Sequence, residues 1–235
     1  MRKLLFFLGC IVTIWSCDTS ETAPDPVRLG YDYYPLEIGQ YALYEVEQTT
    51  YSLTAAPVTI HYQLKEVVAD TFTDLTREKA FKIYRYSRSN AQAAWKQTPD
   101  SVWTAKRTLS RVVRTENNVP FVKLIFPVAD QQTWNGNVLN SRGEDKYELA
   151  ALDKPYTVLA NTFDRTATVV QENDTNNLFY QDRRIEVYAR EVGLIYQEKY
   201  KLQYCGANPA TVCTTPGQID FGTKYIQRIL TYGKE

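Results

Sequence analysis

VTIHYQLK, residues 58–65, is the stretch that decides the fold, because apolar and polar residues alternate through it without a break. Successive side chains of a β-strand point to opposite faces, so this alternation places four apolar groups on one face of a half-buried strand. The same two-residue period recurs, with single interruptions, in residues 122–128, 194–204 and 226–232. Tyr, with 18 copies, is the most frequent aromatic residue, which also favours strands over helices.

Turn signals separate these runs, and helical patterns are scarce. Asn135-Gly136 is the dipeptide that favours a tight hairpin, and residues 172–177 form a polar connection. Residues 89–97 are the best candidate for a short helix, and residues 75–79 for a single turn. We therefore predict a mainly β protein: an antiparallel sheet curled into a barrel-like or sandwich domain over residues 31–235, with one or two short helices.

The N-terminus has the pattern of a lipoprotein secretion signal. Arg2 and Lys3 precede an apolar run of 12 residues, 4–15, which is shorter than the roughly 20 residues of a membrane-spanning helix. Ser16-Cys17 then begins the polar sequence. We predict that residues 1–16 are a cleaved signal peptide, that Cys17 is lipidated, and that the acidic, Pro-containing residues 17–30 are a flexible tether.

The remaining cysteines predict a disulfide. Cys10 falls within the predicted signal peptide, so Cys205 and Cys213 are left as an even pair, separated by Gly, Asn and Pro residues typical of a loop. An exported compartment is oxidising enough to join them. The chain contains one histidine and no CxxC motif, so we predict neither a metal site nor a cofactor.

Charge and motifs argue against nucleic-acid binding and give little support for catalysis. Removal of the signal peptide leaves 25 basic against 27 acidic residues, without the excess of positive charge typical of a nucleic-acid-binding protein. The histidine, His61, alternates with apolar neighbours and is expected to be exposed. Carboxylate pairs such as Glu144 with Asp145, or Asp182 with Glu186, fit a glycosidase only if they share a cleft. We predict no catalytic residue.

Three stretches resemble uncharacterised lipoproteins of the Bacteroidota. Residues 33–46, YYPLEIGQYALYEV, are similar to a "(Y/F)PLxxGxx(W/Y)xY" start of the mature domain. Residues 121–137, with FPV and WNGN, resemble the middle of these proteins, and residues 186–196, EVYAREVGLIY, resemble a "YAxxVGLI" segment near their C-terminus. The resemblance implies a predominantly β lipoprotein without an assigned activity. The turns of these stretches are expected to use Gly39 and Gly193, where a positive φ is favourable.

The same resemblance bears on localisation and modification. Asp18 would favour inner-membrane retention under the enterobacterial sorting rule, whereas acidic residues after the cysteine accompany surface export in Bacteroidota lipoproteins. The resemblance therefore implies an outer-membrane lipid anchor, on either the periplasmic or the surface face. Asp100-Ser101-Val102 is similar to the O-glycosylation motif of exported Bacteroidota proteins, which makes Ser101 a possible modification site.

Two classes of function remain. The first is a noncatalytic binding or assembly module of the cell envelope that is anchored by its lipid and holds a protein, glycan or apolar partner. Trp95, Trp103 and Trp134 could contact such a partner, although core packing is the more common role of tryptophan. The alternative is an extracytoplasmic polysaccharide hydrolase that uses two carboxylates. An open groove with convergent carboxylates would favour the hydrolase, and a side-chain-filled interior would favour the binding module.

Overall fold

Twelve strands and two short helical turns make up the computed structural model, which describes residues 25–207 and 213–235. Within these residues, no helix has the length and apolar character needed to cross a bilayer. The elements, in chain order, are α1 (Pro26–Leu29), η1 (Tyr31–Tyr33), β1 (Gln40–Ser52), β2 (Ala55–Thr73), β3 (Lys79–Arg88), β4 (Ser101–Arg107), β5 (Arg111–Glu116), β6 (Val119–Ile125), β7 (Thr133–Asn135), β8 (Lys146–Val158), β9 (Asn161–Asp174), β10 (Tyr180–Ala189), β11 (Gly193–Tyr204) and β12 (Ile219–Lys234).

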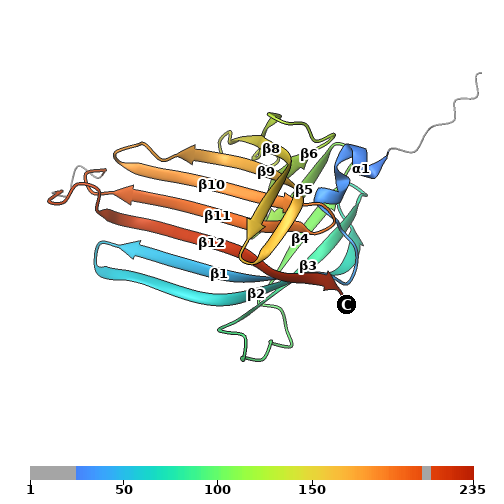
Figure 1. Cartoon of the computed structure of the whole chain (residues 1–235), viewed down its shortest axis with the longest axis horizontal. Coiled ribbons are helices and arrows are strands. Elements are labelled where there is room, and N and C mark those ends of the chain that lie inside the picture. Colours follow the sequence, from blue (N-terminus) through green and yellow to red (C-terminus); the bar gives the residue numbers. More distant parts are fainter. Residues whose placement is uncertain (1–24, 208–212) are drawn as a thin grey trace, which may run out of the picture.

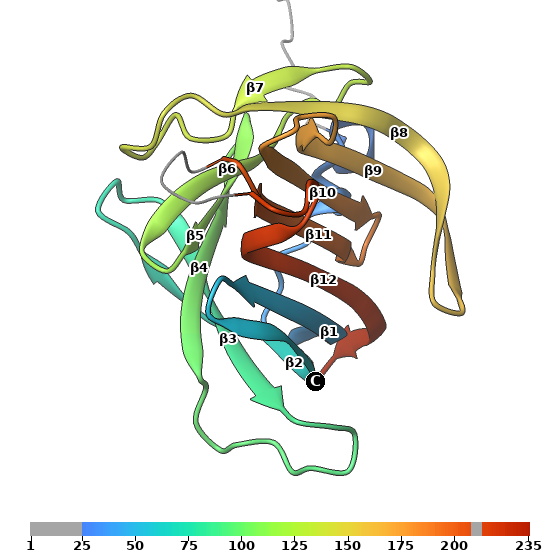
Figure 2. The ribbon, with the colours of Figure 1, turned by 90° about the vertical axis from the view of Figure 1, so that its left-hand side faces the viewer.

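All twelve strands belong to one antiparallel sheet whose order is β6-β5-β4-β3-β2-β1-β12-β11-β10-β9-β8-β7. Every pair of neighbours is also consecutive in sequence except β1 and β12, which join the two ends of the chain. The sheet curls on itself into a nearly closed barrel (Figures 1 and 2). The predicted fold class, an antiparallel barrel-like sheet with short helices, is therefore confirmed.

The sheet closes where β6 meets β7. The backbone N–H of Val122 donates to the carbonyl of Gly136 (2.9 Å), and the indole N–H of Trp134 donates to the carbonyl of Val122 (2.9 Å). These bonds satisfy polar groups that an unpaired edge strand would leave open.

Because the strands run alternately up and down, their connections fall at two ends of the barrel. One end, here called the plugged end, is covered by residues 25–36, which precede β1 (Figure 1, right). The guanidinium of Arg107 donates to the carbonyls of Tyr31 and Tyr34, and that of Arg190 donates to the carboxylate of Asp32. The opposite end, here called the open end, carries the β1–β2, β3–β4, β5–β6, β7–β8, β9–β10 and β11–β12 connections.

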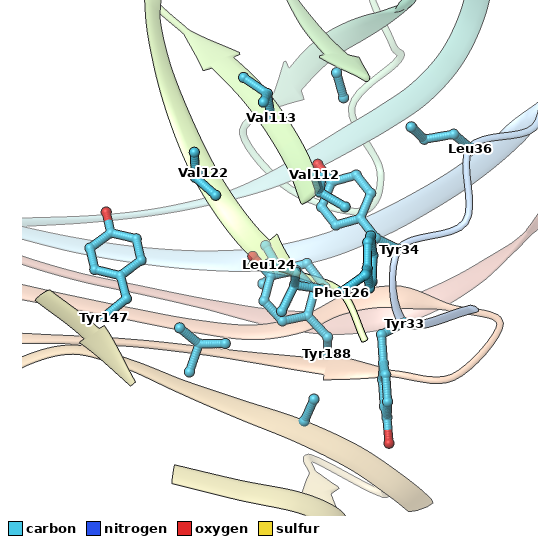
Figure 3. Close-up of a cluster of buried hydrophobic side chains, with 14 of the residues drawn as sticks. Tyr33, Tyr34, Leu36, Val112, Val113, Val122, Leu124, Phe126, Tyr147 and Tyr188 are labelled. Atoms are coloured by element: carbon cyan, nitrogen blue, oxygen red, sulfur yellow. The ribbon is translucent and has the colours of Figure 1, made fainter. Parts of the chain in front are cut away.

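Aromatic side chains from the plug fill the barrel beneath it. Tyr33 and Tyr34 are buried, and Figure 3 shows Tyr34 close to Leu124, Phe126 and Tyr188. Tyr34 and Tyr188 rings lie 5.8 Å apart, a favourable aromatic separation. A second apolar cluster includes Tyr44, Val46, Leu64, Val158, Phe163, Val187, Ile195 and Ile229.

Two features differ from the predicted domain boundaries and helices. Residues 25–30, assigned to the tether, contain α1, which is capped by the Asp25 carboxylate and by Gly30 in the left-handed conformation. Residues 89–97, the predicted helix, form a loop. The Asn90 side chain accepts hydrogen bonds from the backbone N–H groups of Gln92 and Ala93, and this local turn competes with a helix.

The predicted tight turn at Asn135-Gly136 is wrong: β7 and β8 form an antiparallel hairpin, but a ten-residue loop, 136–145, connects them. The side chain of Asn135 accepts from the backbone N–H groups of Asn137 and Asp145, which holds the base of this loop. A Cβ at Gly136 would lie 2.3 Å from the ring of Tyr147. Glycine is therefore required here by close packing rather than by a tight turn.

Other local predictions agree with the structure. Gly39 and Gly193 have positive φ values of 85° and 92° at their turns. A disulfide joins Cys205 to Cys213 across the base of the β11–β12 connection, with a Cα–Cα distance of 5.1 Å. Residues 208–212 between them lie outside the described residues.

The strand predicted from residues 58–65 lies within β2, but its apolar face is only partly buried. Leu64 is buried, whereas Ile60 is 48% exposed and Val58 is 58% exposed. The β1–β2 hairpin extends beyond β3 at the open end, so these outer side chains lack the facing wall of the barrel (Figure 1). Their exposure points to the open end as a surface for interaction.

Gly222 in β12 provides a test of the strand pairing. Its φ of 129° is strained for other residues, and an added Cβ would lie 2.1 Å from the carbonyl oxygen of Lys201. We expect Gly222→Ala to lower the free energy of unfolding by at least about 2 kcal/mol, as measured by urea denaturation. Gly143→Ala is the control, since no atom lies within 4 Å of its added Cβ. Equal stability of the two variants would contradict the described β11–β12 register.

Candidate functional site

A layer of charged side chains crosses the interior of the barrel between the plugged end and the open end. It is called here the ionic belt. Its members come from β2, β3, β5, β6 and β10, and most of them are buried. They are Glu66, Arg85, Arg114, Glu116, Lys123 and Glu186.

One half of the ionic belt centres on Glu66. Its carboxylate accepts from Arg85 (2.8 Å) and from Arg114 (2.6 Å). Both guanidinium groups also lie over the ring of Trp103, at 3.5 and 4.8 Å from its centroid. Arg114 further donates to the hydroxyl of Tyr34 (3.4 Å), which links the belt to the plug.

The other half centres on Lys123, which is 3% exposed. Its ammonium lies 2.8 Å from Glu186 Oε1 and 2.9 Å from Glu116 Oε1. In the β5–β6 pairing, Val112 faces Leu124 and Val113 faces Val122, so Lys123 is the extra residue of a β-bulge. A bulge redirects a side chain, and here it places the lysine between two carboxylates.

The charges of the ionic belt hold one another in the ionised state. Burial alone would raise the pKa of Glu66, but Arg114 and Arg85 outweigh burial and lower it. Burial is likewise outweighed at Glu116 and Glu186, where neighbouring cations, above all Lys123, hold the pKa below its ordinary value. Burial alone would lower the pKa of Lys123, but the carboxylates of Glu116 and Glu186 outweigh burial and raise it. All three acids are therefore carboxylates at neutral pH.

This arrangement is unsuited to two-carboxylate hydrolysis. Such a reaction needs one protonated acid with a raised pKa beside a space for the sugar, whereas Glu116 and Glu186 are both ionised on the same ammonium. The other candidate pairs are also engaged: Asp145 and Asp182 both bind Arg184, and Glu144 is an exposed residue of the β7–β8 loop. Glu116, Glu186, Asp145 and Asp182 are thus held in ion pairs, whereas Glu144 faces solvent.

Two cavities open on the open-end side of the ionic belt. The larger, about 700 Å³, is called here the β2–β4 cavity because residues of β2, β3, β4 and the β3–β4 loop line most of it. It combines apolar side chains with hydrogen-bonding ones. Its lining includes Ile60, Tyr62, Leu64, Arg85, Ser87, Arg88, Ala94, Asp100 and Ser101.

The smaller cavity, about 380 Å³, is called here the cationic cavity. It lies between β6, the β7–β8 loop and β9–β11. Both volumes fall within the range of small-molecule sites. Its charged lining residues are Glu116, Lys123, Arg142, Glu144, Asp145, Arg184, Lys199 and Lys201.

The tryptophans noted in the sequence have different surroundings. Trp134 is buried at the β6–β7 closure and Trp103 lies within the ionic belt, so both contribute to packing. Trp95 is half-buried and lies against Arg88, with 4.3 Å from guanidinium to ring centroid. Arg88 is fixed by two hydrogen bonds to the Gln63 side chain and lines the β2–β4 cavity.

The remaining predicted site residues are His61, Ser101 and Cys17. His61 is exposed, and Ser101 is half-buried at the start of β4, where both line the β2–β4 cavity. Cys17 lies outside the described residues. Among residues 25–207 and 213–235, no group of three or more His, Cys, Asp or Glu residues is placed to hold a metal ion.

The sequence analysis missed the ionic belt, although one signal for it was present. Glu66 continues the apolar phase of Tyr62 and Leu64, and Arg114 continues that of Val112. A charged residue at a position expected to face the core predicts a buried ion pair. Lys123 gave no such signal, because a bulge that shifts the phase cannot be recognised from alternation alone.

Replacement of Lys123 tests the importance of the ionic belt. Lys123→Met leaves two buried carboxylates without their shared partner, and we expect the free energy of unfolding to fall by about 3–5 kcal/mol in urea denaturation. Lys154→Met, which alters an exposed lysine of the β8–β9 hairpin, is the matched control and should change stability by less than about 0.5 kcal/mol. Similar effects of the two changes would contradict the role of Lys123.

Acid sensitivity provides a second test. Glu66, Glu116 and Glu186 have lowered pKa values in the folded protein, so their stabilisation is present above the unfolded pKa of about 4.3 and is lost as pH falls through the folded values. We expect the melting temperature to fall below about pH 4.3. Glu66→Gln should be less stable at neutral pH but lose less stability on acidification. An equal acid-induced loss in both proteins would contradict this account.

Comparison with known proteins gives little further information. No protein-family model and no curated protein matches the chain. One solved structure is similar, a Bacteroides fragilis protein described as exported and as having a YmcC-like fold. The two chains are 9% identical with a TM-score of 0.33, over 84% of this chain and 98% of the other. At this level of similarity, the function must be argued from the residues of this chain.

Proposed function

We propose that this protein is a noncatalytic glycan-binding lipoprotein of the cell envelope, of the Bacteroidota type, held in the outer membrane by lipid on Cys17. The observation that carries the binding role is the β2–β4 cavity, which has a volume of about 700 Å³ and combines apolar with hydrogen-bonding side chains at the open end of the barrel. The lipid anchor is supported by the signal pattern of residues 1–17. Seven residues, 18–24, separate Cys17 from the plug, so the plugged end is the one nearer to the membrane in this proposal.

The character of the β2–β4 cavity favours a glycan over an acyl chain. A sugar presents apolar faces edged by hydroxyl groups, and the cavity offers Tyr62 and Ile60 beside the polar side chains of Gln48, Ser87 and Arg88. An acyl chain is longer than this cavity and would extend inward to the ionic belt. There its apolar surface would lie against charged side chains, which is unfavourable. The same belt supports a noncatalytic role, because its carboxylates are ionised and paired.

Lipidation is tested at Cys17. In cells that express the full chain, Cys17→Ala should abolish incorporation of a labelled palmitate analogue, because the acceptor thiol is lost. Cys10→Ala, within the signal peptide, is the control and should leave incorporation unchanged. Equal incorporation of the label by the Cys17→Ala protein would contradict lipidation at Cys17.

Glycan binding is tested at the β2–β4 cavity with a screen of envelope and host polysaccharides against the detergent-solubilised mature protein. Ala94 is exposed and lines the cavity, so Ala94→Trp should occupy the space and weaken binding at least tenfold, about 1.4 kcal/mol. Ala91→Trp, in the same loop, is the matched control. Failure of every polysaccharide to bind, with a protein partner captured instead, would overturn the glycan assignment. Turnover of a polysaccharide would overturn the noncatalytic one.

A further inference from the structure

Large apolar side chains protrude from the plugged end of the barrel (Figure 1, right). Val27 of α1 is 48% exposed and Ile38, between the plug and β1, is 53% exposed. Leu109 of the β4–β5 connection is 78% exposed, and Leu75 of the β2–β3 connection is fully exposed. These four side chains are called here the apolar tips. They come from four separate segments that the sheet topology brings to one end.

Hydrogen bonds place two of the apolar tips beside each other on the plug. The carbonyl of Leu109 accepts from the hydroxyl of Tyr31 in η1 (2.9 Å), so the β4–β5 connection lies against the plug. The carbonyl of Val27 accepts from the guanidinium of Arg190 (2.9 Å), which fixes α1 to the end of β10. Both backbones are thus held in place, whereas both side chains face solvent.

The other two apolar tips flank the start of β1 and the end of β2. Ile38 precedes Gly39, whose backbone N–H donates to the carbonyl of Val68 in β2 (2.8 Å). In the β2–β3 turn, the ammonium of Lys106 from β4 donates to both carboxylates, at 2.6 Å each. The acidic side chains of this turn are therefore drawn against β4, and Leu75 is the side chain left fully exposed. An apolar residue presented in this way marks a surface for interaction.

The chain between Cys17 and the plug identifies what faces this surface. Residues 18–24 can extend over at most about 30 Å, and a flexible segment of this length typically spans about 15 Å. The twelve residues of β11 alone cover about 40 Å between the two ends of the barrel. A lipid on Cys17 therefore holds the plugged end against the bilayer, and the apolar side chains of the open end cannot meet the same bilayer end-on.

Charges of both signs accompany the apolar tips. Asp25 and Arg28 flank Val27 on either side in α1. Glu37, next to Ile38, pairs with Lys234 at 2.9 Å. Anionic headgroups attract clusters of basic residues, and these mixed charges do not form such a cluster. Contact between this surface and a bilayer would therefore rest on apolar insertion and would be insensitive to salt.

We propose that the apolar tips insert into the interfacial region of the bilayer that holds the anchor, so that the plugged end rests on the membrane and the open end faces away. A few exposed side chains bind a bilayer weakly on their own, but the anchor gives them a high effective concentration at its surface. The inference rests on the proposed lipid on Cys17 and goes beyond it, because it assigns a membrane-contacting surface to the barrel itself.

Fluorescent labels at the apolar tips test the inference in the acylated mature protein, after its addition to preformed phosphatidylcholine vesicles. Leu75→Cys and Leu109→Cys are labelled with nitrobenzoxadiazole, and nitroxide-bearing lipids serve as quenchers. Leu178→Cys is the matched control, because Leu178 is 82% exposed in the β9–β10 connection at the open end. We expect quenching at positions 75 and 109 to be at least about threefold stronger than at 178, and to persist at high salt. Equal quenching at the three positions would overturn the inference.

A charge placed among the apolar tips tests whether they insert together. Ile38→Glu should lower the quenching of the label at position 109 at least about twofold, because a carboxylate resists entry into the bilayer. Leu53→Glu is the matched control: Leu53 has a similar exposure in the β1–β2 connection at the open end, and its replacement should leave quenching unchanged. Equal effects of the two substitutions would contradict insertion by a shared surface.

This inference and the proposed anchor fail in different ways. If the purified protein carries no lipid by intact mass, both the anchor and the membrane contact of the barrel are wrong. If the lipid is present and the protein is bound to vesicles, but the labels at positions 75 and 109 are quenched no more than that at 178, the membrane contact is wrong and the anchor stands. Glycan binding is measured at the opposite end of the barrel and does not depend on either result.

Discussion

The contact on which the interior depends is the ammonium of Lys123 between the carboxylates of Glu116 and Glu186. Two carboxylates so close together would repel each other strongly in a low-dielectric interior. The ammonium of Lys123 attracts both of them and offsets this repulsion. Tyr188 and Gln197 donate further hydrogen bonds to Glu186, so the charges are satisfied as a network. The barrel thus has a polar layer where a simple apolar core would be expected, and this layer separates its two ends.

The two ends of the barrel have different physical roles. At the plugged end, residues 25–36 bring aromatic side chains into the core and tie together several strand connections through Arg107 and Arg190. At the open end, the long hairpins extend beyond their neighbours and leave apolar and charged side chains exposed around two cavities. One half therefore ties strand connections together through the plug, whereas the other half exposes its connections around the two cavities.

Strand-level features of the fold could be predicted from the sequence, because alternation in β2 and the positive-φ glycines at 39 and 193 depend on local preferences. The Asn135-Gly136 signal was misleading because glycine is required there by close packing of the β7–β8 loop against Tyr147 of β8. The cationic cavity could not be predicted either. Its lining includes Lys123 and Gln171, which are the extra residues of two bulges, and a bulge arises from how two strands align across the sheet rather than from either strand alone.

The pairing of β1 with β12 has a consequence for the order of assembly. Strands β1–β6 and β7–β12 are two meanders made of neighbours in sequence, and the β1–β12 ladder is the strand pairing that joins them in the sheet. Each meander can begin to form from local hairpins. The ladder between them cannot form before β12, the last sixteen residues of the sheet, is available to pair with β1. Until then both halves keep an unpaired edge and an exposed inner face. A chain with this connectivity completes its sheet late in folding.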